Sequence, residues 1–244
     1  MRFFSCLKLR IHKLRIVFNY PTLRRALFFH RILAGVEHKT ALNRPISTIV
    51  DIGANRGQFS LAAKIFTDAN IIAFEPLPIA AGIFRKIFSH DPSVTLFNAA
   101  IGNCHERMKL HLSARDDSSS LLEIGDAQSN YFPGTHEIGS IEVDVGTLDD
   151  FMTKEDIIRP ALLKLDVQGF ELQALDGCQN LLENFDYIYC ECSFVELYKN
   201  QKLAGDVILY LGKLGFRLSG LYNLSNDRNG NCIQADLLFT QFSD

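Results

Sequence analysis

The chain has 244 residues, of which 47% are hydrophobic and 22% are charged, and this composition excludes a disordered or low-complexity protein. Its net charge of −3 is unevenly distributed: the first 36 residues contain eight Lys or Arg and no acid, so the rest of the chain is strongly acidic. Nucleic-acid binders usually carry a basic stripe on the folded domain, so the acidic body predicts no nucleic-acid partner.

The sequence has no features of secretion or of a membrane span. No apolar run reaches the roughly 18 residues that cross a bilayer, and cations interrupt the apolar start, which no cleavage site of small residues follows. The six cysteines form no C-x-x-C pair and no zinc-like cluster, and Cys190 and Cys192 are interpreted as buried, reduced thiols. Reduced thiols are typical of the cytoplasm, where we expect this protein.

The amino-terminal segment mixes apolar residues with cations. Residues 2–18 contain five cations, Pro21 ends this stretch, and a second basic and apolar helix is predicted at about 22–35. Such helices either lie on a membrane surface or a membrane-bound partner, or pack on the domain with their cations in solvent. The sequence leaves both interpretations open. We divide the chain into a basic helical segment, 1–45, and a main domain, 46–244.

From residue 47 onward, strands and helices alternate along the chain. Short apolar and β-branched runs predict strands at 47–52, 70–74 and 94–98, with helices at 57–66 and 77–88 between them. This alternation is typical of a parallel sheet with helices on both faces.

The middle section departs from this alternation, which then resumes. Strands are predicted at 107–113 and 140–145, and the polar stretch between them, 114–139, is expected to be a functional lid or a disordered segment. The remaining elements are strands at 161–165, 187–194, 216–221 and 233–239, and helices at 170–183 and 204–214. The predicted fold class is α/β, with a single doubly wound, Rossmann-like domain.

The strongest local motif lies at the end of the first predicted strand. Asp51 ends this strand, and Gly53 and Gly57 precede a helix, so the backbone can turn tightly and approach a ligand closely. Glu75 ends the next strand, 22 residues after Gly53, where an acid binds ribose hydroxyls in doubly wound nucleotide sites. Gln58 replaces the third glycine of the dinucleotide motif, which disfavours NAD, and Asp51 favours a ligand with an ammonium group. The motif alone leaves NAD and S-adenosylmethionine open.

Three later strands also carry polar residues at or near their ends. Asn98 can bind an adenine edge or simply form a turn. Lys164 and Asp166 share a face of one strand, so Asp166 can take a substrate proton, hold a metal or pair with Lys164. Glu191 lies in an apolar strand, where an unpaired charge is costly, so we expect it at the ligand crevice or in a pair. Asp166, Glu171 and Glu191 could together hold a divalent metal, but no metal is predicted.

Six motifs follow one another in a specific order, at residues 50–57, 74–76, 98–102, 118–121, 147–149 and 164–171. This ordered set resembles the FkbM family of methyltransferases over about residues 46–240. The resemblance implies a class I methyltransferase fold, whose seven-stranded, mostly parallel sheet has an antiparallel last strand. It also implies S-adenosylmethionine as methyl donor and O-methylation of sugars, glycans or polyketide-like metabolites. A small-molecule or glycan acceptor is therefore the expected partner.

The resemblance assigns roles to particular positions of this chain. Asp51, Gly53, Ala54, Asn55, Gly57, Glu75, Pro76, Asn98 and Ala99 would bind the donor. Ser118, Ser119, Ser120 and Glu171 would border the acceptor. Asp166 is the first candidate for the base and Glu191 the second, with Lys164 beside them. Gln168 departs from the family, in which Glu is frequent at this position. The competing functions are a dinucleotide-dependent oxidoreductase and a catalytically inactive nucleotide-binding module.

Overall fold

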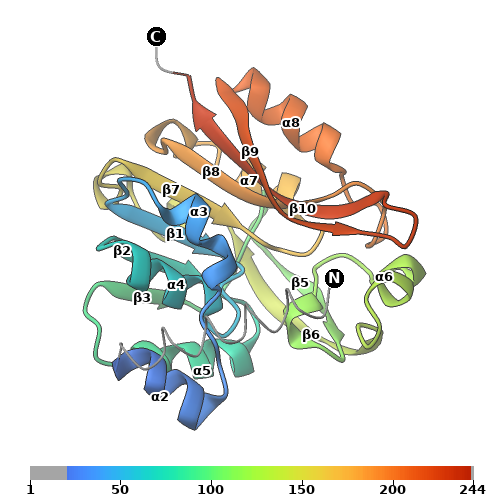
Figure 1. Cartoon of the computed structure of the whole chain (residues 1–244), viewed down its shortest axis with the longest axis horizontal. Helices are drawn as coiled ribbons and strands as arrows, with labels where there is room; N and C mark the ends of the chain where they lie inside the picture. Colours follow the sequence, from blue (N-terminus) through green and yellow to red (C-terminus); the bar gives the residue numbers. More distant parts are fainter. Residues whose placement is uncertain (1–20, 243–244) are drawn as a thin grey trace.

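The computed structural model describes residues 21–242, which contain a seven-stranded sheet with the strand order β3-β2-β1-β7-β8-β10-β9 (Figure 1). Its strands are β1 (Thr48–Ile52), β2 (Asn70–Phe74), β3 (Val94–Phe97), β7 (Ala161–Leu165), β8 (Tyr187–Ser193), β9 (Phe216–Asn226) and β10 (Cys232–Gln241). Neighbours from β3 to β8 are parallel, whereas β10 is antiparallel to both β8 and β9. The predicted fold class is confirmed. The predicted basic stretch at 2–18 lies outside the described residues.

The register of the parallel strands brings their carboxyl ends level. Ile52, the last residue of β1, is aligned with Phe74 of β2 and with Leu165 of β7. Every residue of β1 and β7 is buried, as expected for strands covered on both faces. The chain segments that leave these strands therefore meet at one edge of the sheet. In doubly wound folds, this edge binds ligands where the strand order reverses, here between β1 and β7.

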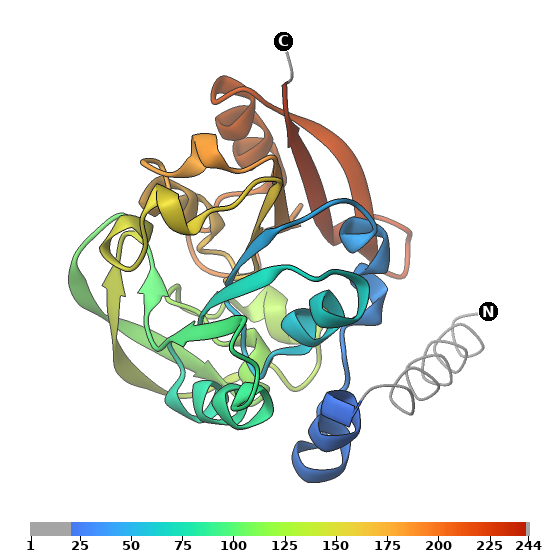
Figure 2. The same cartoon turned by 90° about the vertical axis from the view of Figure 1, so that its left-hand side faces the viewer.

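Helices cover both faces of the sheet (Figures 1 and 2). They are α2 (Pro21–His30), α3 (Lys39–Leu42), α4 (Gln58–Phe66), α5 (Pro78–Phe88), α7 (Glu171–Gly177) and α8 (Ala204–Lys213), whereas α6 (Asp126–Tyr131) lies with the middle section of the chain. One apolar core packs α7 and α8 against the sheet. A second core packs the four helices α2, α3, α4 and α5 against its other face. The neighbours Ile49 and Val50 belong to different cores, because successive side chains of a strand point to opposite faces.

A smaller three-stranded sheet, with the order β4-β6-β5, holds the middle section of the chain. Its strands are β4 (Ala100–Ile101), β5 (Glu106–Ser113) and β6 (Glu137–Gly146). The polar stretch 114–139 was expected to be either a functional lid or a disordered segment, and the structure shows that it is ordered. It contains the 3-10 helix η2 (Asp116–Ser118) and α6, and bridges join His111 to Ser120 and Ile124 to Tyr198. Backbone pairing with neighbouring segments therefore fixes the conformation of this stretch. Its polar composition gave no sign of this pairing.

Several element boundaries differ from the sequence prediction. The helix expected at 170–183 ends at Gly177, and 3-10 turns follow, including η5 (Leu182–Asn184). The helix expected at 22–35 ends at His30, because Arg31 adopts the left-handed conformation that terminates helices (φ 57°). The other 3-10 helices are η1 (Val36–His38), η3 (Leu148–Asp150) and η4 (Lys154–Asp156).

The described part of the amino-terminal segment packs on the domain. Leu23 and Ala26 of α2 are buried in the same core as α4 and α5, while Arg24 and Arg25 are exposed. The proposed division at residues 45 and 46 stays a prediction. Within residues 21–242, no helix is both long enough and apolar enough to cross a membrane.

Candidate active site

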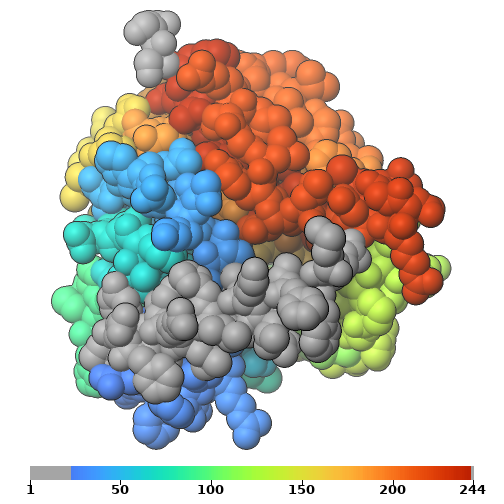
Figure 3. All heavy atoms as spheres, in the orientation of Figure 1, coloured from blue at the N-terminus to red at the C-terminus, as the bar shows by residue number. Residues whose placement is uncertain are grey.

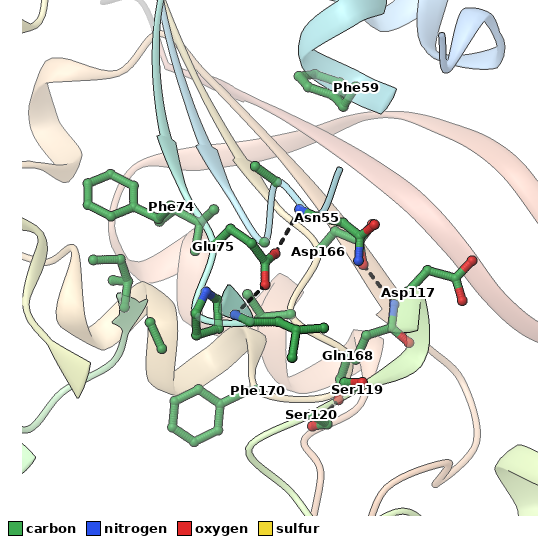
Figure 4. A pocket seen from close by; sticks show the side chains of 18 of the residues that line it. Asn55, Phe59, Phe74, Glu75, Asp117, Ser119, Ser120, Asp166, Gln168 and Phe170 are labelled. Atoms are coloured by element: carbon green, nitrogen blue, oxygen red, sulfur yellow. Dashed lines mark hydrogen bonds between the residues drawn. The ribbon is translucent and has the colours of Figure 1, made fainter. Parts of the chain in front are cut away.

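A cavity of about 250 Å³ lies at the edge where β1, β2 and β7 end (Figure 4). Its walls also include β4, β5, η1, η2 and the segment after η2. The predicted site residues that line it are Gly53, Ala54, Asn55, Glu75, Pro76, Ala99, Ser119, Ser120, Lys164 and Asp166. The predicted site residues outside its lining are Asp51, Gly57, Asn98, Ser118, Glu171 and Glu191. The structure thus separates residues at the cavity surface from residues that support them.

Two glycines with positive φ shape the loop after β1. At Gly53 (φ 76°), a Cβ atom would lie 1.9 Å from the backbone oxygen of Asp166. At Gly57 (φ 93°), a Cβ atom would lie 2.8 Å from the ring of Phe88. A side chain at either position would push the loop away from its neighbours. Gly57 therefore acts on the cavity indirectly, by letting α4 begin close to α5.

Glu75 presents a buried carboxylate whose position is fixed by the backbone. Its two oxygens accept hydrogen bonds of 2.7 Å each from the backbone N–H groups of Asn55 and Leu77. Burial raises the pKa of Glu75 to about 7, although these hydrogen bonds act in the opposite direction. Figure 4 shows the carboxylate between the loop after β1 and the segment after β2, where it can accept hydrogen bonds from a ligand's hydroxyl groups.

The cavity continues from Glu75 to an apolar end. Leu77, Ala99, Ile101, Leu110 and Phe170 line this end and offer a surface for a flat, uncharged ring. The predicted adenine contact from Asn98 is not supported by its placement, since the Asn98 side-chain amide donates to the backbone oxygens of Glu75 (2.7 Å) and Pro76 (3.0 Å). These bonds hold the turn after β2.

Asp51 lies beneath the cavity floor and is fully buried. Its carboxylate is 3.0 Å from Nζ of Lys164 and accepts a 2.7 Å hydrogen bond from the Ser60 hydroxyl. Lys164 also donates a hydrogen bond to the backbone oxygen of Gly53. Burial acts to lower the pKa of Lys164, but the negative charges of Asp51 and Asp166 outweigh this effect and raise the pKa. The negative charge of Asp51 is therefore neutralised within the protein. Its expected contact with a ligand's ammonium group is not supported by this arrangement.

Asp166 follows β7 and belongs to the cavity wall. Its nearest cation is Lys164, whose Nζ lies 3.9 Å from Oδ2, so the pairing considered from the sequence is weaker than the Lys164–Asp51 pair. The side chain of Asp166 is 39% exposed, and its Oδ1 accepts a 2.7 Å hydrogen bond from Nε2 of Gln168. Asp166 thus offers an accessible carboxylate held in one orientation.

Gln168 joins the two predicted carboxylates. Its Nε2 also donates to Oε2 of Glu191 (2.8 Å), and its Oε1 accepts from the Tyr198 hydroxyl (2.6 Å). Glu191 is half-buried next to Gln168, and its desolvation together with the carboxylates of Asp166 and Asp236 raises the pKa of Glu191 well above its ordinary value. The surroundings therefore favour a protonated Glu191.

The residues predicted to border an acceptor divide into two groups. Ser119 and Ser120 line the cavity, and the Ser120 hydroxyl donates to the backbone oxygen of Gln168 (2.6 Å). Ser118 is buried, and its backbone oxygen accepts from Tyr198. Glu171 is buried too. Its carboxylate accepts hydrogen bonds from the backbone N–H groups of Val167 (3.3 Å) and Gly169, and these bonds close the turn before α7.

The sequence analysis missed a histidine at the cavity wall. His38 of η1 lines the cavity, and its Nδ1 lies 3.1 Å from the Tyr189 hydroxyl and 3.4 Å from Oδ2 of Asp236. Asp236 also accepts hydrogen bonds from Tyr189 (2.8 Å) and from the Asn223 amide (2.6 Å). The imidazole stands edge-on to Phe59. No motif could have revealed this group, because only tertiary packing joins η1 to β10.

Comparisons with known proteins agree with this arrangement. The chain is 29% identical over 167 residues to the 2-O-methyltransferase NoeI of Sinorhizobium fredii, covering 66% of this chain and 69% of NoeI. It is 26% identical over 199 residues to the 31-O-demethyl-FK506 methyltransferase FkbM of Streptomyces tacrolimicus, covering 71% and 74% of the two chains. The hexuronic acid methyltransferase AglP of Haloferax volcanii is 25% identical over 144 residues, which are 58% of this chain and 54% of AglP.

The match to a family model covers most of the domain. The model described as the Methyltransferase FkbM domain matches residues 51–218, which include the loop after β1, Glu75, Asp166 and Gln168. This chain therefore belongs to the FkbM family of S-adenosylmethionine-dependent methyltransferases.

Proposed function

We propose that this methyltransferase transfers its methyl group to a hydroxyl oxygen of a sugar, a glycan or a secondary metabolite, with Asp166 as the base. The observation that carries the proposal is the accessible carboxylate of Asp166 in the wall of the cavity that also holds Glu75. A hydroxyl group is a poor nucleophile, so a positioned base accelerates its attack. The similarity to the 2-O-methyltransferase NoeI and to the 31-O-demethyl-FK506 methyltransferase FkbM supports oxygen as the accepting atom.

The cavity residues fit S-adenosylmethionine. Glu75 would accept hydrogen bonds from the ribose hydroxyls, and the apolar end with Leu110 and Phe170 would cover the adenine ring. Gln58, which also lines the cavity, has a buried Oε1 without a hydrogen-bond partner among the described residues, and this oxygen could accept from the ammonium group of the methionine part. The bound donor supplies an activated methyl group, so the protein's tasks are alignment and proton removal.

The hydrogen bonds around Asp166 support one of its two oxygens as the proton acceptor. Gln168 donates to Oδ1 and leaves Oδ2 without this bond, so we infer that Oδ2 takes the hydroxyl proton. This transfer accompanies formation of the oxygen–carbon bond and cleavage of the carbon–sulfur bond. The raised pKa of Glu191 favours its protonated form, which makes Glu191 the weaker candidate for the base.

Mass spectrometry of an acceptor extract tests the proposal. Glycans and small metabolites are incubated with S-adenosylmethionine and either the wild type or Asp166→Asn. The wild type is expected to add one methyl group to a hydroxyl of at least one component, and the variant is expected to add almost none. Binding of S-adenosylhomocysteine without any methylated product would contradict transfer and favour a non-catalytic binding module.

A further inference from the structure

The outward face of α2 combines aromatic and basic side chains. Phe28 and Phe29 are 67% and 77% exposed, and Arg24, Arg25 and Arg31 are exposed as well. We call these five residues the α2 surface patch. The arginines at 24 and 25 precede the phenylalanines by four residues each, so all four helical members lie on one side of the helix. Figures 2 and 3 show α2, in dark blue, at the rim of the molecule.

The opposite face of α2 explains why this patch is presented outward. Leu23 and Ala26 are buried in the core that includes α4 and α5, and they fix the helix on the domain. Two neighbouring phenylalanine side chains in water forfeit the free energy that burial would provide. An apolar patch of this kind next to a basic rim indicates an interaction site.

We propose that the α2 surface patch docks on an anionic lipid surface, with Phe28 and Phe29 entering the headgroup region. Charge complementarity supports this partner, because α2 carries no acid and the first 36 residues contain eight cations and no acid. The acidic remainder of the chain would be repelled by the same surface, so docking would orient the molecule with α2 toward the bilayer. Basic and aromatic helices lie at membrane interfaces for these reasons.

The docking surface is close in sequence to the cavity wall. Only residues 31–35 separate α2 from η1, whose Glu37 and His38 line the cavity. Gly35 fixes this link, because its N–H donates to the backbone oxygen of Gln58 (2.8 Å) at the start of α4. A docked α2 would therefore hold one wall of the active site near the bilayer, where an acceptor carried by a lipid would be presented. This consequence rests on the proposed function, whereas the docking does not.

Vesicle flotation of the full chain tests the docking. The vesicles contain either phosphatidylcholine alone or a mixture of phosphatidylcholine and phosphatidylserine. The wild type is expected to float with the mixture and to lose binding as salt is added. The double variant Arg24→Gln/Arg25→Gln should bind roughly 25-fold more weakly, at about fivefold per cation. Phe28→Ser/Phe29→Ser should lose binding as well.

A matched control variant separates the patch from general surface apolarity. Leu209 of α8 is 68% exposed, and Leu209→Ser is expected to float like the wild type. Binding of S-adenosylhomocysteine, measured in every variant, reports separately on the fold and on the donor site. The proposal would be overturned if Phe28→Ser/Phe29→Ser floated as well as the wild type does. It would also be overturned if the wild type bound neither kind of vesicle. Loss of a dimer in that variant, without vesicle binding by the wild type, would assign the patch to a second copy of the chain.

Discussion

At the level of single residues, one side-chain amide separates two carboxylates with different surroundings. Nε2 of Gln168 donates to both Asp166 and Glu191, but only Asp166 lines the cavity. Glu191 is half-buried outside the cavity lining, and its raised pKa favours the protonated form. The sequence offered both residues as bases. The place of Asp166 in the cavity wall and the raised pKa of Glu191 make Asp166 the stronger candidate.

Replacing Asp166 by Asn keeps the size of the side chain and removes its charge. We expect kcat to fall by roughly 100-fold or more, as is usual for the loss of a positioned base. The affinity for S-adenosylhomocysteine should change little, because Glu75 and the loop after β1 remain intact. Steady-state kinetics and calorimetry measure the two effects. Glu191→Gln is the matched comparison and should retain most of the turnover; the reverse ranking would make Glu191 the base.

Replacing Gln168 by Glu tests how the amide controls Asp166. The substitution removes the donated hydrogen bonds and places a third carboxylate next to Asp166 and Glu191. A like charge next to a carboxyl group disfavours its ionised form, so proton removal by the carboxylates around residue 168 should need a higher pH. The acidic limb of the pH–rate profile is expected to move upward by about one unit or more. An unchanged limb would mean that Asp166 does not control the rate in this pH range.

The raised pKa of Glu75 predicts a pH dependence of donor binding. Glu75 has a pKa of about 7 in the free protein, and its ionised form is the better acceptor for ribose hydroxyls. Below this pKa, binding must expel a proton, so the affinity for S-adenosylhomocysteine should be about tenfold lower at pH 6 than at pH 8. Calorimetry over this range is the measurement. Glu75→Gln, which cannot ionise, should bind weakly and without this slope, and an equal slope in both proteins would point to a different group.

At the level of elements, the strands were predicted better than the segments that join them. The strands at 70–74 and 161–165 have the predicted boundaries, because buried parallel strands are continuous apolar runs. The polar stretch 114–139 gave no such signal. Its order comes from bridges to His111 and Tyr198, which are distant partners that local composition cannot reveal. The end of α7 at Gly177 was missed for a related reason, since the apolar pattern continues beyond the helix.

The close approach of α7 to the turn after β4 predicts a difference between two glycines. A Cβ at Gly177 would lie 2.1 Å from the backbone oxygen of Gly102, whereas nothing lies within 4 Å of a Cβ at Gly82 in α5. Gly177→Ala should therefore lower the free energy of unfolding by about 1–3 kcal/mol. Gly82→Ala should raise it by about 0.5–1 kcal/mol, because alanine favours a helix over glycine.

Chemical denaturation of both variants measures these changes. Neither glycine has a positive φ, so the contrast reports on packing and not on backbone strain. Equal stability of the two variants would mean that α7 can move away from Gly102 without cost.

At the level of the whole molecule, the sequence predicted the residues at the strand ends of the cavity better than the wall that contains His38. The order of motifs pointed to Gly53, Glu75 and Asp166, because each directly follows a strand whose end lies at the ligand edge. The wall that contains His38 depends on packing of η1 against the sheet, where His38 contacts Tyr189 of β8 and Asp236 of β10. Residues so distant in the chain show their relationship only after the fold has formed. For the same reason, the sequence could not distinguish the cavity-lining Asp166 from the buried Asp51.

We expect the donor to lie along the strand edge, from the apolar end of the cavity, past Glu75, to Asp166. A crystal structure of the protein with S-adenosylhomocysteine would show this placement. We expect the adenine against Phe170, the ribose hydroxyls on the Glu75 carboxylate, and the sulfur facing Oδ2 of Asp166 with space for an acceptor oxygen between them. A complex in which the sulfur points away from Asp166, or in which the ribose does not contact Glu75, would contradict this expectation.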